Sequence, residues 1–325
     1  MPISHVDITD QRSLYRETHV VTLRHYRYDV GVVFILISGA AFGLLPWFAR
    51  TAYGHGAEPL GLLTARFILS AIGLIVIRLI VQRGVPWPKR PLAIQLFLLG
   101  ACGYAIQSSF YFFGIQRMDV SLATVIFYTF PVMVVFSSWI LFHQRPSRQI
   151  VLCLTVVVFG AVLTAGQVKT GSLTGVLIML AAAGWYTGYI LVASKITRKA
   201  GALTSLTLVM IGASVAHLAA WPVHQSSLPN DSIGWVAALG AAFISTIIGM
   251  GFFFAGVARI DPGEAAVLST MEPIVSIAVG VIALNESLTT VQIVGALAVL
   301  VGVTLAAQLS RASEKKRSRA DSILP

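Results

Sequence analysis

The sequence has few charged residues. Lys, Arg, Asp and Glu make up 11% of its 325 residues, whereas soluble domains carry about a quarter. Because 56% of the residues are hydrophobic, a soluble protein of this length would have to bury an implausibly large apolar surface. The composition therefore excludes an ordinary soluble domain and favours an integral membrane protein.

Cysteine is scarce, and the common catalytic motifs are missing. Cys102 and Cys153 lie inside apolar runs without metal-ligand spacing, so we interpret both as small core residues. The chain has no P-loop for ATP, no HExxH, no paired aspartates, and no His- or Cys-based nucleophile site within its apolar runs. We therefore expect no metal and no cofactor, and we do not expect an enzyme.

Long hydrophobic runs dominate the chain, and they predict ten membrane-spanning helices. A spanning helix needs about 20 mostly apolar residues, and the period-two alternation of a membrane barrel is absent. The runs cover residues 30–50, 59–81, 92–115, 120–142, 149–167, 172–194, 202–223, 232–256, 264–284 and 288–309. The expected fold class is an all-α membrane protein.

Lys and Arg gather in alternate connections between the runs. If the N-terminus lies inside, nineteen of them fall on the inner side, and only Arg50, Arg117 and Lys169 fall outside. Basic residues prefer the cytoplasmic side. This predicts cytoplasmic N- and C-termini for a multi-pass protein of the plasma membrane, which is the inner membrane in a bacterium. Cytoplasmic termini also require an even number of spans.

The two ends of the chain are polar. Residues 1–28 lack the apolar core and cleavage site of a signal peptide, so we interpret them as a cytoplasmic N-terminal tail. Residues 310–325 form a basic cytoplasmic tail. We expect both tails to be disordered and solvated near the membrane surface, with no nucleic acid as partner.

The second half of the chain repeats the first. Residues 114–136 align with residues 256–278 without a gap. The matched pairs are Gly114 with Gly256, Arg117 with Arg259, Asp119 with Asp261, and Pro131 with Pro273. We predict a first five-helix repeat over 29–168 and a second over 169–309. A unit of five spans must insert its second copy upside down, and inverted repeats around a central cavity are typical of secondary transporters.

Two glycine pairs occupy loosely corresponding places in the first and sixth spans. They are Gly39 with Gly43 and Gly184 with Gly188. Glycines four residues apart let helix backbones approach closely in membranes. We therefore expect close helix packing at both pairs.

Three stretches resemble a known family. They are "GIQRMDVSLATVIFYTFPVMVVF" (114–136), "GVARIDPGEAAVLSTMEPIVSIAVGVIALNESLTTVQIVGALAVLVGVTLA" (256–306), and Arg66 within "LLTARFILS". Over residues 30–309 the chain resembles the drug/metabolite transporter (DMT) superfamily in its EamA-type ten-span branch. The first copy departs from the pattern, with Gln144 where the family usually has Glu. The resemblance implies efflux or exchange of small metabolites through a central cavity, without ATP.

Glu272 is the carboxylate inside the ninth predicted span. It lies about 13 Å from the cytoplasmic end of that helix, near the middle of a hydrocarbon layer about 30 Å thick. A charge there is costly unless it is paired, hydrated or neutralised. The equivalent residue of the first repeat is Phe130, so packing does not require a carboxylate. We predict that Glu272 faces the cavity and binds a cation, a substrate amine or a proton; the alternative is a protonated packing residue.

Two prolines, Pro131 and Pro273, stand at equivalent places in the fourth and ninth spans. Each removes a backbone donor and bends its helix, and the freed carbonyl needs another partner in lipid. Broken helices at a repeat interface are where transporter substrate sites usually lie. We predict that both prolines are hinges, with a static kink as the alternative.

Arg66 is a cation well inside the predicted span 59–81, and three roles fit it. It could pair with Glu272, hold a substrate carboxylate, or cap the carbonyls of a helix end, and we favour the cap. The remaining candidate substrate-binding residues are polar aromatics and an amide in the third, fourth and sixth spans: Tyr104, Gln107, Tyr111, Tyr128, Trp185 and Tyr186.

The sequence favours a secondary active transporter of the plasma membrane that exports or exchanges small metabolites, such as amino acids or related amines, by alternating access. Its partners would be a small-molecule substrate, the lipid bilayer and, as a candidate coupling ion, the proton; the chain would be a monomer or a homodimer. One alternative is a nucleotide-sugar or phosphorylated-metabolite carrier, which would need several cations facing the cavity. An intramembrane enzyme, or a channel with a ring of charges, is the alternative from a different class.

Overall fold

The structure, a computed structural model, describes residues 29–142, 147–165, 173–257, 259 and 268–321. Within these ranges every regular element is a helix and none is a strand, which confirms the all-α fold class. The predicted N-terminal tail 1–28, the connection at 143–146 and the start of the ninth span before 268 lie outside the described residues.

The helices follow one another through short connections. The first covers residues 29–43. The others are α2 (Leu45–Gly54), α3 (Pro59–Val81), α4 (Arg90–Leu98), the π-helix η1 (Leu99–Tyr104), α5 (Ala105–Arg117), α6 (Val120–Phe127), α7 (Phe130–Phe142), α8 (Arg148–Ala165), α9 (Leu173–Ile196), the 3-10 helix η3 (Thr197–Lys199), α10 (Ala202–His224), α11 (Ser232–Gly240), the π-helix η4 (Ala241–Ile248), α12 (Gly249–Val257), α14 (Met271–Ala283) and α15 (Thr290–Asp321).

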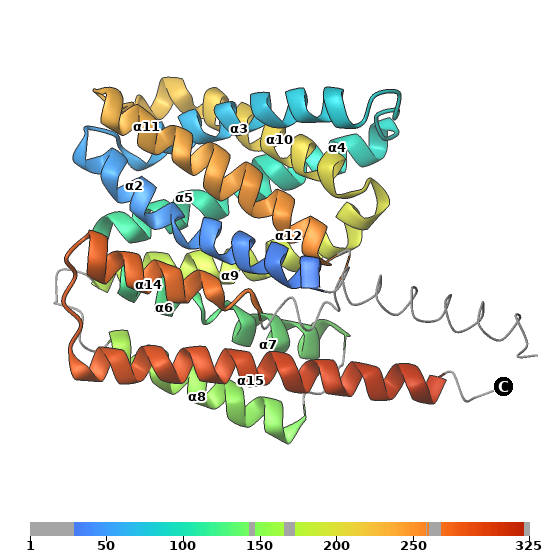
Figure 1. Cartoon of the computed structure of the whole chain (residues 1–325), viewed down its shortest axis with the longest axis vertical. Coiled ribbons are helices and arrows are strands. Elements are labelled where there is room, and N and C mark those ends of the chain that lie inside the picture. The colour runs from blue at the N-terminus through green and yellow to red at the C-terminus, as the bar shows by residue number, and fades with distance from the viewer. Residues whose placement is uncertain (1–28, 143–146, 166–172, 258, 260–267, 322–325) are drawn as a thin grey trace, which may run out of the picture.

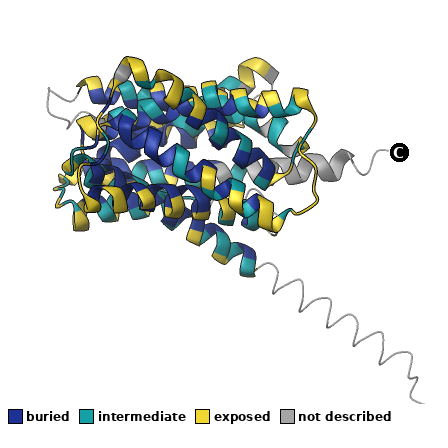
Figure 2. Ribbon diagram, turned by 90° about the horizontal axis from the view of Figure 1, so that it is seen from above, coloured by how far each residue is buried: buried dark blue, intermediate teal, exposed yellow. Residues whose placement is uncertain are grey.

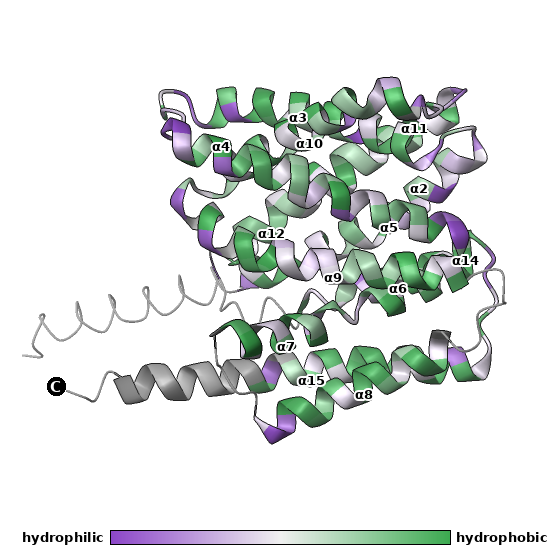
Figure 3. Ribbon diagram, turned by 180° about the vertical axis from the view of Figure 1, so that it is seen from behind, coloured by the Kyte–Doolittle hydropathy of each residue, from purple (hydrophilic) through white to green (hydrophobic). Residues whose placement is uncertain are grey.

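Seven helices in the described ranges are long and apolar enough to cross a membrane: Asp29–Gly54, Pro59–Val81, Arg90–Arg117, Val120–Leu141, Leu173–Ala193, Ala202–Val223 and Ser232–Val257. Three further apolar helices are shorter, Arg148–Thr164, Met271–Ala283 and Thr290–Ala306. Figure 3 shows hydrophobic residues along the helices and hydrophilic ones gathered toward the ends of the bundle. The chain is therefore a multi-pass membrane protein, while the count of ten spans stays a prediction.

The helices lie side by side in one bundle (Figure 1). The helix α8 packs along α15 at one side of it, and α3, α10 and α11 lie at the other side. Buried residues fill the middle and exposed residues line the outside (Figure 2). A site formed by helices from both halves of the chain would therefore lie among these buried residues in the middle of the bundle.

Large apolar side chains point outward. Leu152 is 67% exposed, Phe159 is 62% exposed and Ile282 is 78% exposed. Conversely, Arg66 and Thr246 are completely or almost completely buried. An apolar exterior around a partly polar interior is what a lipid environment selects, because backbone and side-chain polar groups must find partners inside the protein.

Two helices are interrupted at equivalent places in the two halves. The helix α6 ends at Phe127 and α7 begins at Phe130, one residue before Pro131. A turn at residues 269–270 precedes α14, which begins at Met271, two residues before Pro273. Both predicted hinge prolines thus follow directly after a break in a membrane helix.

The two π-helices also occupy equivalent places. The helix η1 begins at Leu99 and η4 begins at Ala241, which is the same spacing that relates Pro131 to Pro273. A π-helix widens the backbone spiral by one residue and occurs often at functional sites. The sequence analysis did not predict either π-helix.

Two sequence expectations are wrong. The tail from residue 310, expected to be disordered, continues α15 as a helix through Asp321; its Arg, Lys, Glu and Ala residues are good helix formers. Cys102, expected in the core, is exposed, whereas Cys153 is buried as expected. Hydrophobic surroundings in the sequence do not separate a lipid-facing residue from a buried one.

Candidate functional site

Glu272 lies in the first turn of α14, directly after the break in this helix. Its backbone N–H donates to the carbonyl of Ser269 at 3.1 Å. The first helix packs against this turn through its glycine pair, because a Cβ on Gly39 would lie 3.2 Å from the Glu272 nitrogen and one on Gly43 would lie 2.7 Å from its carbonyl oxygen. The Ser276 hydroxyl also donates to the Gly43 carbonyl at 3.1 Å. The close packing expected at this pair is therefore what positions Glu272.

The side chain of Glu272 is surrounded by tyrosine hydroxyls. The Tyr128 hydroxyl lies within hydrogen-bonding reach of the carboxylate. Tyr111 and Tyr186 are close enough for their hydroxyls to interact electrostatically with it. Tyr111 is on α5, Tyr128 follows α6, and Tyr186 is on α9. The structure thus brings four of the predicted site residues together from four separate elements.

The aromatic cluster extends beyond these tyrosines. The Tyr186 and Tyr189 rings stack at 5.9 Å, and Tyr189 contacts Tyr104 at 5.7 Å. On the other side, Tyr186 contacts Phe130 at 5.0 Å. Phe127 contacts Tyr111 and Tyr186 as well. A continuous path of aromatic rings therefore links the surroundings of Glu272 to Tyr104.

Sequence reasoning did not include Tyr189 and Phe130 in the site. A usable signal existed for both. Tyr189 follows Tyr186 by three residues and so shares its helix face. Phe130 occupies the position of the first repeat that corresponds to Glu272, and repeat-related positions meet at a repeat interface.

Arg66 is 1% exposed and lies on α3. Its Nε donates to the Thr246 hydroxyl at 2.9 Å and its Nη2 to the Tyr104 hydroxyl at 3.1 Å. The guanidinium carbon also lies 5.4 Å from the ring centroids of both Phe67 and Phe112, a cation–π distance. The favoured role as a cap for helix carbonyls is wrong for these contacts, because both hydrogen-bond acceptors are side-chain hydroxyls.

Two predicted site residues lie away from the carboxylate. Gln107 is buried on α5 and accepts a hydrogen bond from the neighbouring Ser108 hydroxyl at 3.4 Å. Trp185 is 43% exposed, and its indole N–H donates to the Gly103 carbonyl at 3.0 Å. On a helix, consecutive residues point in different directions, so Tyr186 faces the cluster while Trp185 anchors α9 to η1.

The second glycine pair does not reproduce the packing of the first. Among the described side chains, a Cβ on Gly184 would meet only the Met133 sulfur, at 3.9 Å, and one on Gly188 would meet no atom within 4 Å. The expected close helix contact at Gly188 is therefore absent from the part of the chain that the structure describes. The two halves of the chain are packed differently around their broken helices.

Glu286, which the sequence analysis did not assign to the site, joins the two halves of the chain. Its Oε1 accepts the Val120 N–H at 2.6 Å, and its Oε2 accepts the Ser121 N–H at 3.0 Å and the Ser121 hydroxyl at 2.7 Å. Glu286 follows α14, whereas Val120 and Ser121 open α6. A carboxylate at a helix start accepts hydrogen bonds from the free backbone amides, and its negative charge interacts favourably with the helix dipole. Glu286 therefore holds the end of one broken helix onto the start of the other.

A polar cavity of about 960 Å³ lies at the same end of the bundle as Glu286. Its walls come from the end of α2, the connection between α5 and α6, and the connection between α14 and α15; they include Arg50, Tyr53, Arg117, Asp119 and Glu286. The Arg50 guanidinium donates to the Met118 carbonyl at 3.2 Å. In the predicted orientation this end faces the outside of the cell.

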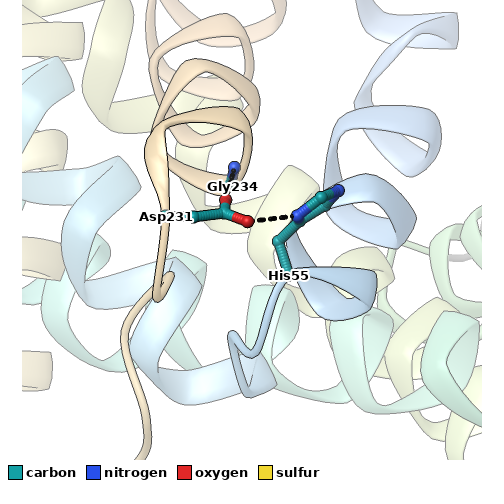
Figure 4. Close-up of polar contacts among 3 residues, drawn as sticks. All are labelled: His55, Asp231 and Gly234. Carbon is teal, nitrogen blue, oxygen red and sulfur yellow. Dashed lines mark hydrogen bonds and ion pairs between the residues drawn. The ribbon is translucent and has the colours of Figure 1, made fainter.

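Two connections at this end are joined by hydrogen bonds (Figure 4). His55 Nδ1 lies 2.6 Å from Asp231 Oδ2, and Asp231 Oδ1 accepts the Gly234 N–H at 2.9 Å as the cap of α11. The Asn230 N–H donates to the His55 carbonyl at 2.9 Å. The Gly234 amide and then the His55 side chain lower the pKa of Asp231. The connection after α2 is thereby fixed to the one before α11.

These features define the class of protein: a multi-pass membrane protein with a partly buried carboxylate, Glu272, set among tyrosines. No group of three or more His, Cys, Asp or Glu side chains able to hold a metal occurs in the described ranges. The chain belongs to the EamA-like transporter family, whose model matches residues 29–166 and again residues 173–308.

Curated relatives agree with this family. The Escherichia coli K12 "Threonine/homoserine exporter RhtA" is 27% identical, with 73% of this chain and 79% of the relative covered. The Salmonella typhimurium "Probable amino-acid metabolite efflux pump" is 26% identical over 77% of this chain and 85% of the relative. The Bacillus subtilis "Uncharacterized transporter YcbK" is 23% identical over 82% of this chain and 88% of the relative. The chain is thus similar to membrane transporters over most of its length.

A solved crystal structure shares the fold. It superposes with a TM-score of 0.63 at 18% identity and covers 87% of this chain and 98% of the other. At this identity the likeness concerns the arrangement of helices.

Proposed function

We propose that this protein is a secondary active transporter of the plasma membrane that exports or exchanges small metabolites, such as amino acids or related amines, by alternating access. The observation that carries the proposal is Glu272, a partly buried carboxylate between broken membrane helices with the hydroxyls of Tyr111, Tyr128 and Tyr186 around it. A carboxylate in this position can bind an ammonium group or a proton, and the rings offer faces to an organic cation.

The inverted repeat of ten spans is part of this proposal, with repeats over 29–168 and 169–309. Three features support it, at a spacing of 142 residues or one residue less: the two π-helices, the two helix breaks before Pro131 and Pro273, and the partners of Arg66. Tyr104 and Thr246 are related by the same 142-residue offset as the repeats. Arg66 donates to both, so its guanidinium contacts equivalent residues of the two halves, as a residue near a pseudo-twofold axis would.

Alternating access would use the breaks as hinges. The first helix is packed tightly against α14 through Gly43, whereas the corresponding Gly188 of α9 has open space beside it. In an inverted-repeat transporter the two repeats adopt different conformations in one state and exchange them in the other. The unequal packing supports this mechanism, with Pro131 and Pro273 absorbing the change in angle.

The proposed substrate class follows from the site. Glu272 suits an amine, and the tyrosine hydroxyls suit polar groups of a small metabolite. The more distant wall of the site would be formed by the other predicted site residues, Tyr104, Gln107, Trp185 and Arg66. These residues would orient Glu272 and the tyrosines around it. The names of two relatives, an amino-acid metabolite efflux pump and a threonine/homoserine exporter, support amino acids as the first substrates to test.

The proposed orientation places both termini in the cytoplasm. Cysteine accessibility in intact cells tests it. A cysteine at Leu228, in the connection before α11, should react with an impermeant reagent without permeabilisation, and one at Val85 should not. Labelling of the Leu228→Cys variant only after permeabilisation would overturn the proposed topology.

Transport itself is tested in proteoliposomes. Purified protein is reconstituted, the vesicles are loaded with a panel of amino acids and amines, and efflux is recorded with and without a pH gradient. We expect protein-dependent efflux of at least one amine-containing metabolite. This efflux should be faster when the outside is more acidic than the vesicle interior, because inward proton flow then drives it. Efflux no faster than from empty liposomes for the whole panel would contradict the proposed substrate class.

A further inference from the structure

An apolar groove opens on the side of the bundle, away from the Glu272 site. Its volume is about 540 Å³, and every residue in its walls is apolar. The walls come from the first helix, α3, α10, η4 and α12, with Phe34, Leu206, Phe252 and Ala255 among them. On the η4–α12 side, Ile248 and Gly251 are exposed. The groove therefore faces the surroundings of the protein along its membrane-spanning part.

The groove has a defined end. Ala202 and Leu203 of its wall open α10, and Ala255 belongs to the last turn of α12. Both helix ends point to the same end of the bundle, the one that the charge pattern assigns to the cytoplasm. A molecule in the groove thus meets the membrane–water interface at these residues.

Cations surround this end. The Arg259 side chain is exposed and extends over two groove residues, donating to the Ala255 carbonyl at 2.6 Å with its guanidinium carbon 5.1 Å from the Phe34 ring centroid. Lys199 is exposed in η3, three residues before α10. Asp29 is the acid that opens the first helix here. Among the described residues at this rim, Arg259 and Lys199 stand against the one carboxylate of Asp29, so this described part of the rim is positive.

The start of α10 adds donors. Its cap residue, Gly201, has no side chain to bond the first amides of the helix. Amides at a helix start attract phosphate groups, and here they lie beside the rim cations. The rim therefore complements a phosphate, and the groove complements a hydrocarbon chain.

We propose that this groove binds one acyl chain of a monoanionic phospholipid, with the lipid phosphate at Arg259 and the start of α10. A monoanionic headgroup fits better than a more highly charged one, because Asp29 stands at the same rim. The site is separate from the Glu272 cluster and does not depend on which metabolite is transported.

Native mass spectrometry of the detergent-purified full chain tests the site, with dioleoyl phosphatidylglycerol or dioleoyl phosphatidylcholine added in turn. We expect wild type to retain one phosphatidylglycerol with about fivefold preference over phosphatidylcholine, the factor that one basic side chain contributes near an anionic headgroup. Equal retention of the two lipids would overturn the headgroup assignment.

Two variants distinguish acyl-chain binding in the groove from headgroup binding at the rim. Among the described residues, a Cβ on Gly251 meets no atom within 4 Å. Gly251→Leu therefore fills the groove and should reduce retention of both lipids at least several-fold. The matched control is Ala181→Leu, which adds the same side chain on the exposed face of α9. Arg259→Gln should abolish the preference for phosphatidylglycerol but keep acyl binding, while Arg83→Gln, an exposed cation at the same end, keeps the preference.

Each result bears on the proposal. Retention by Gly251→Leu equal to that by Ala181→Leu would place the lipid elsewhere and refute the groove. If Gly251→Leu melts well below wild type, Ala255→Leu fills the groove from the same helix one turn further on and is held to the same expectation. A preference that survives in Arg259→Gln would refute the role of the rim.

Discussion

The contact made by Glu286 gives a sharp prediction about stability. This carboxylate accepts three hydrogen bonds, from the backbone N–H groups of Val120 and Ser121 and from the Ser121 hydroxyl. Glu286→Gln keeps the size of the side chain but replaces one accepting oxygen by an NH₂ group, which faces donors and cannot accept from them.

The loss can be sized from the contact. A hydrogen bond to a charged group contributes about 1.5–3 kcal/mol and a helix cap about 1 kcal/mol. One oxygen of Glu286 still accepts in the glutamine variant, and the side chain is only partly buried. We therefore expect Glu286→Gln to lower the free energy of unfolding by about 2 kcal/mol.

A second substitution reaches the same contact from the opposite side. A Cβ on Gly280 would collide with the Glu286 carboxylate and the Ser121 hydroxyl. Gly280→Ala should therefore displace the carboxylate, and the double variant should lose clearly less than the two single losses together, because both remove one contact. Additive losses would mean that the two substitutions act independently.

The measurement is unfolding of the purified protein in a mixed-detergent titration, followed by circular dichroism. Glu58→Gln is the matched control, since the exposed Glu58 carboxylate accepts one backbone N–H, that of Ser227, at 3.0 Å. We expect the control to change stability by less than about 1 kcal/mol. A Glu286→Gln variant no less stable than this control would refute the reasoning.

Three further outcomes follow from the packing. Gly43→Val should destabilise the protein by about 1–3 kcal/mol and slow transport, because its side chain would enter the backbone of α14; transport and melting like wild type would contradict the contact. Arg66→Met should cost about 1–3 kcal/mol because it strands the buried Tyr104 hydroxyl, and Arg66→Met with Tyr104→Phe should recover part of that loss. Asp231 has a lowered pKa in the folded state, so its contribution is present above the unfolded pKa of about 4 and is lost as the pH falls through the lower folded value. Asp231→Asn should keep the helix cap but flatten the dependence of melting temperature on pH in this acidic range. An unchanged dependence would exclude Asp231 as its source.

Much of this molecule could be predicted from the sequence. Apolar runs of about 20 residues allow few structures, because lipid leaves a backbone no partner outside its own helix. The described helices follow the predicted runs, while the start of the ninth run lies outside the described residues. The matches at Pro131 and Pro273 located both helix breaks. The cost of a charge in lipid identified Glu272, and three of the tyrosines named as candidate substrate-binding residues lie around it.

Other parts of the site could not be predicted because they depend on contacts between distant segments. Arg66 donates a hydrogen bond to Thr246, which is 180 residues away in the sequence. No local sequence pattern predicts that a hydroxyl is its partner. Trp185 and Tyr186 are neighbours in sequence yet face opposite surroundings, since the sequence alone does not fix the rotation of an apolar helix. The contact of Glu286 with Val120 and Ser121 spans 166 and 165 residues of the chain, and no local pattern predicts it.

The central claim is that the charge of Glu272 drives transport, and efflux by the Glu272→Gln variant tests it most directly. Wild type, Glu272→Gln and the surface control Glu58→Gln are reconstituted in proteoliposomes loaded with the best substrate of the panel, and efflux is recorded across a range of imposed pH gradients. The account predicts that Glu272→Gln keeps its expression and melting temperature but loses gradient-driven efflux by about tenfold or more, because the glutamine can neither bind a proton nor neutralise an amine. Near-normal, pH-dependent efflux by Glu272→Gln would contradict it.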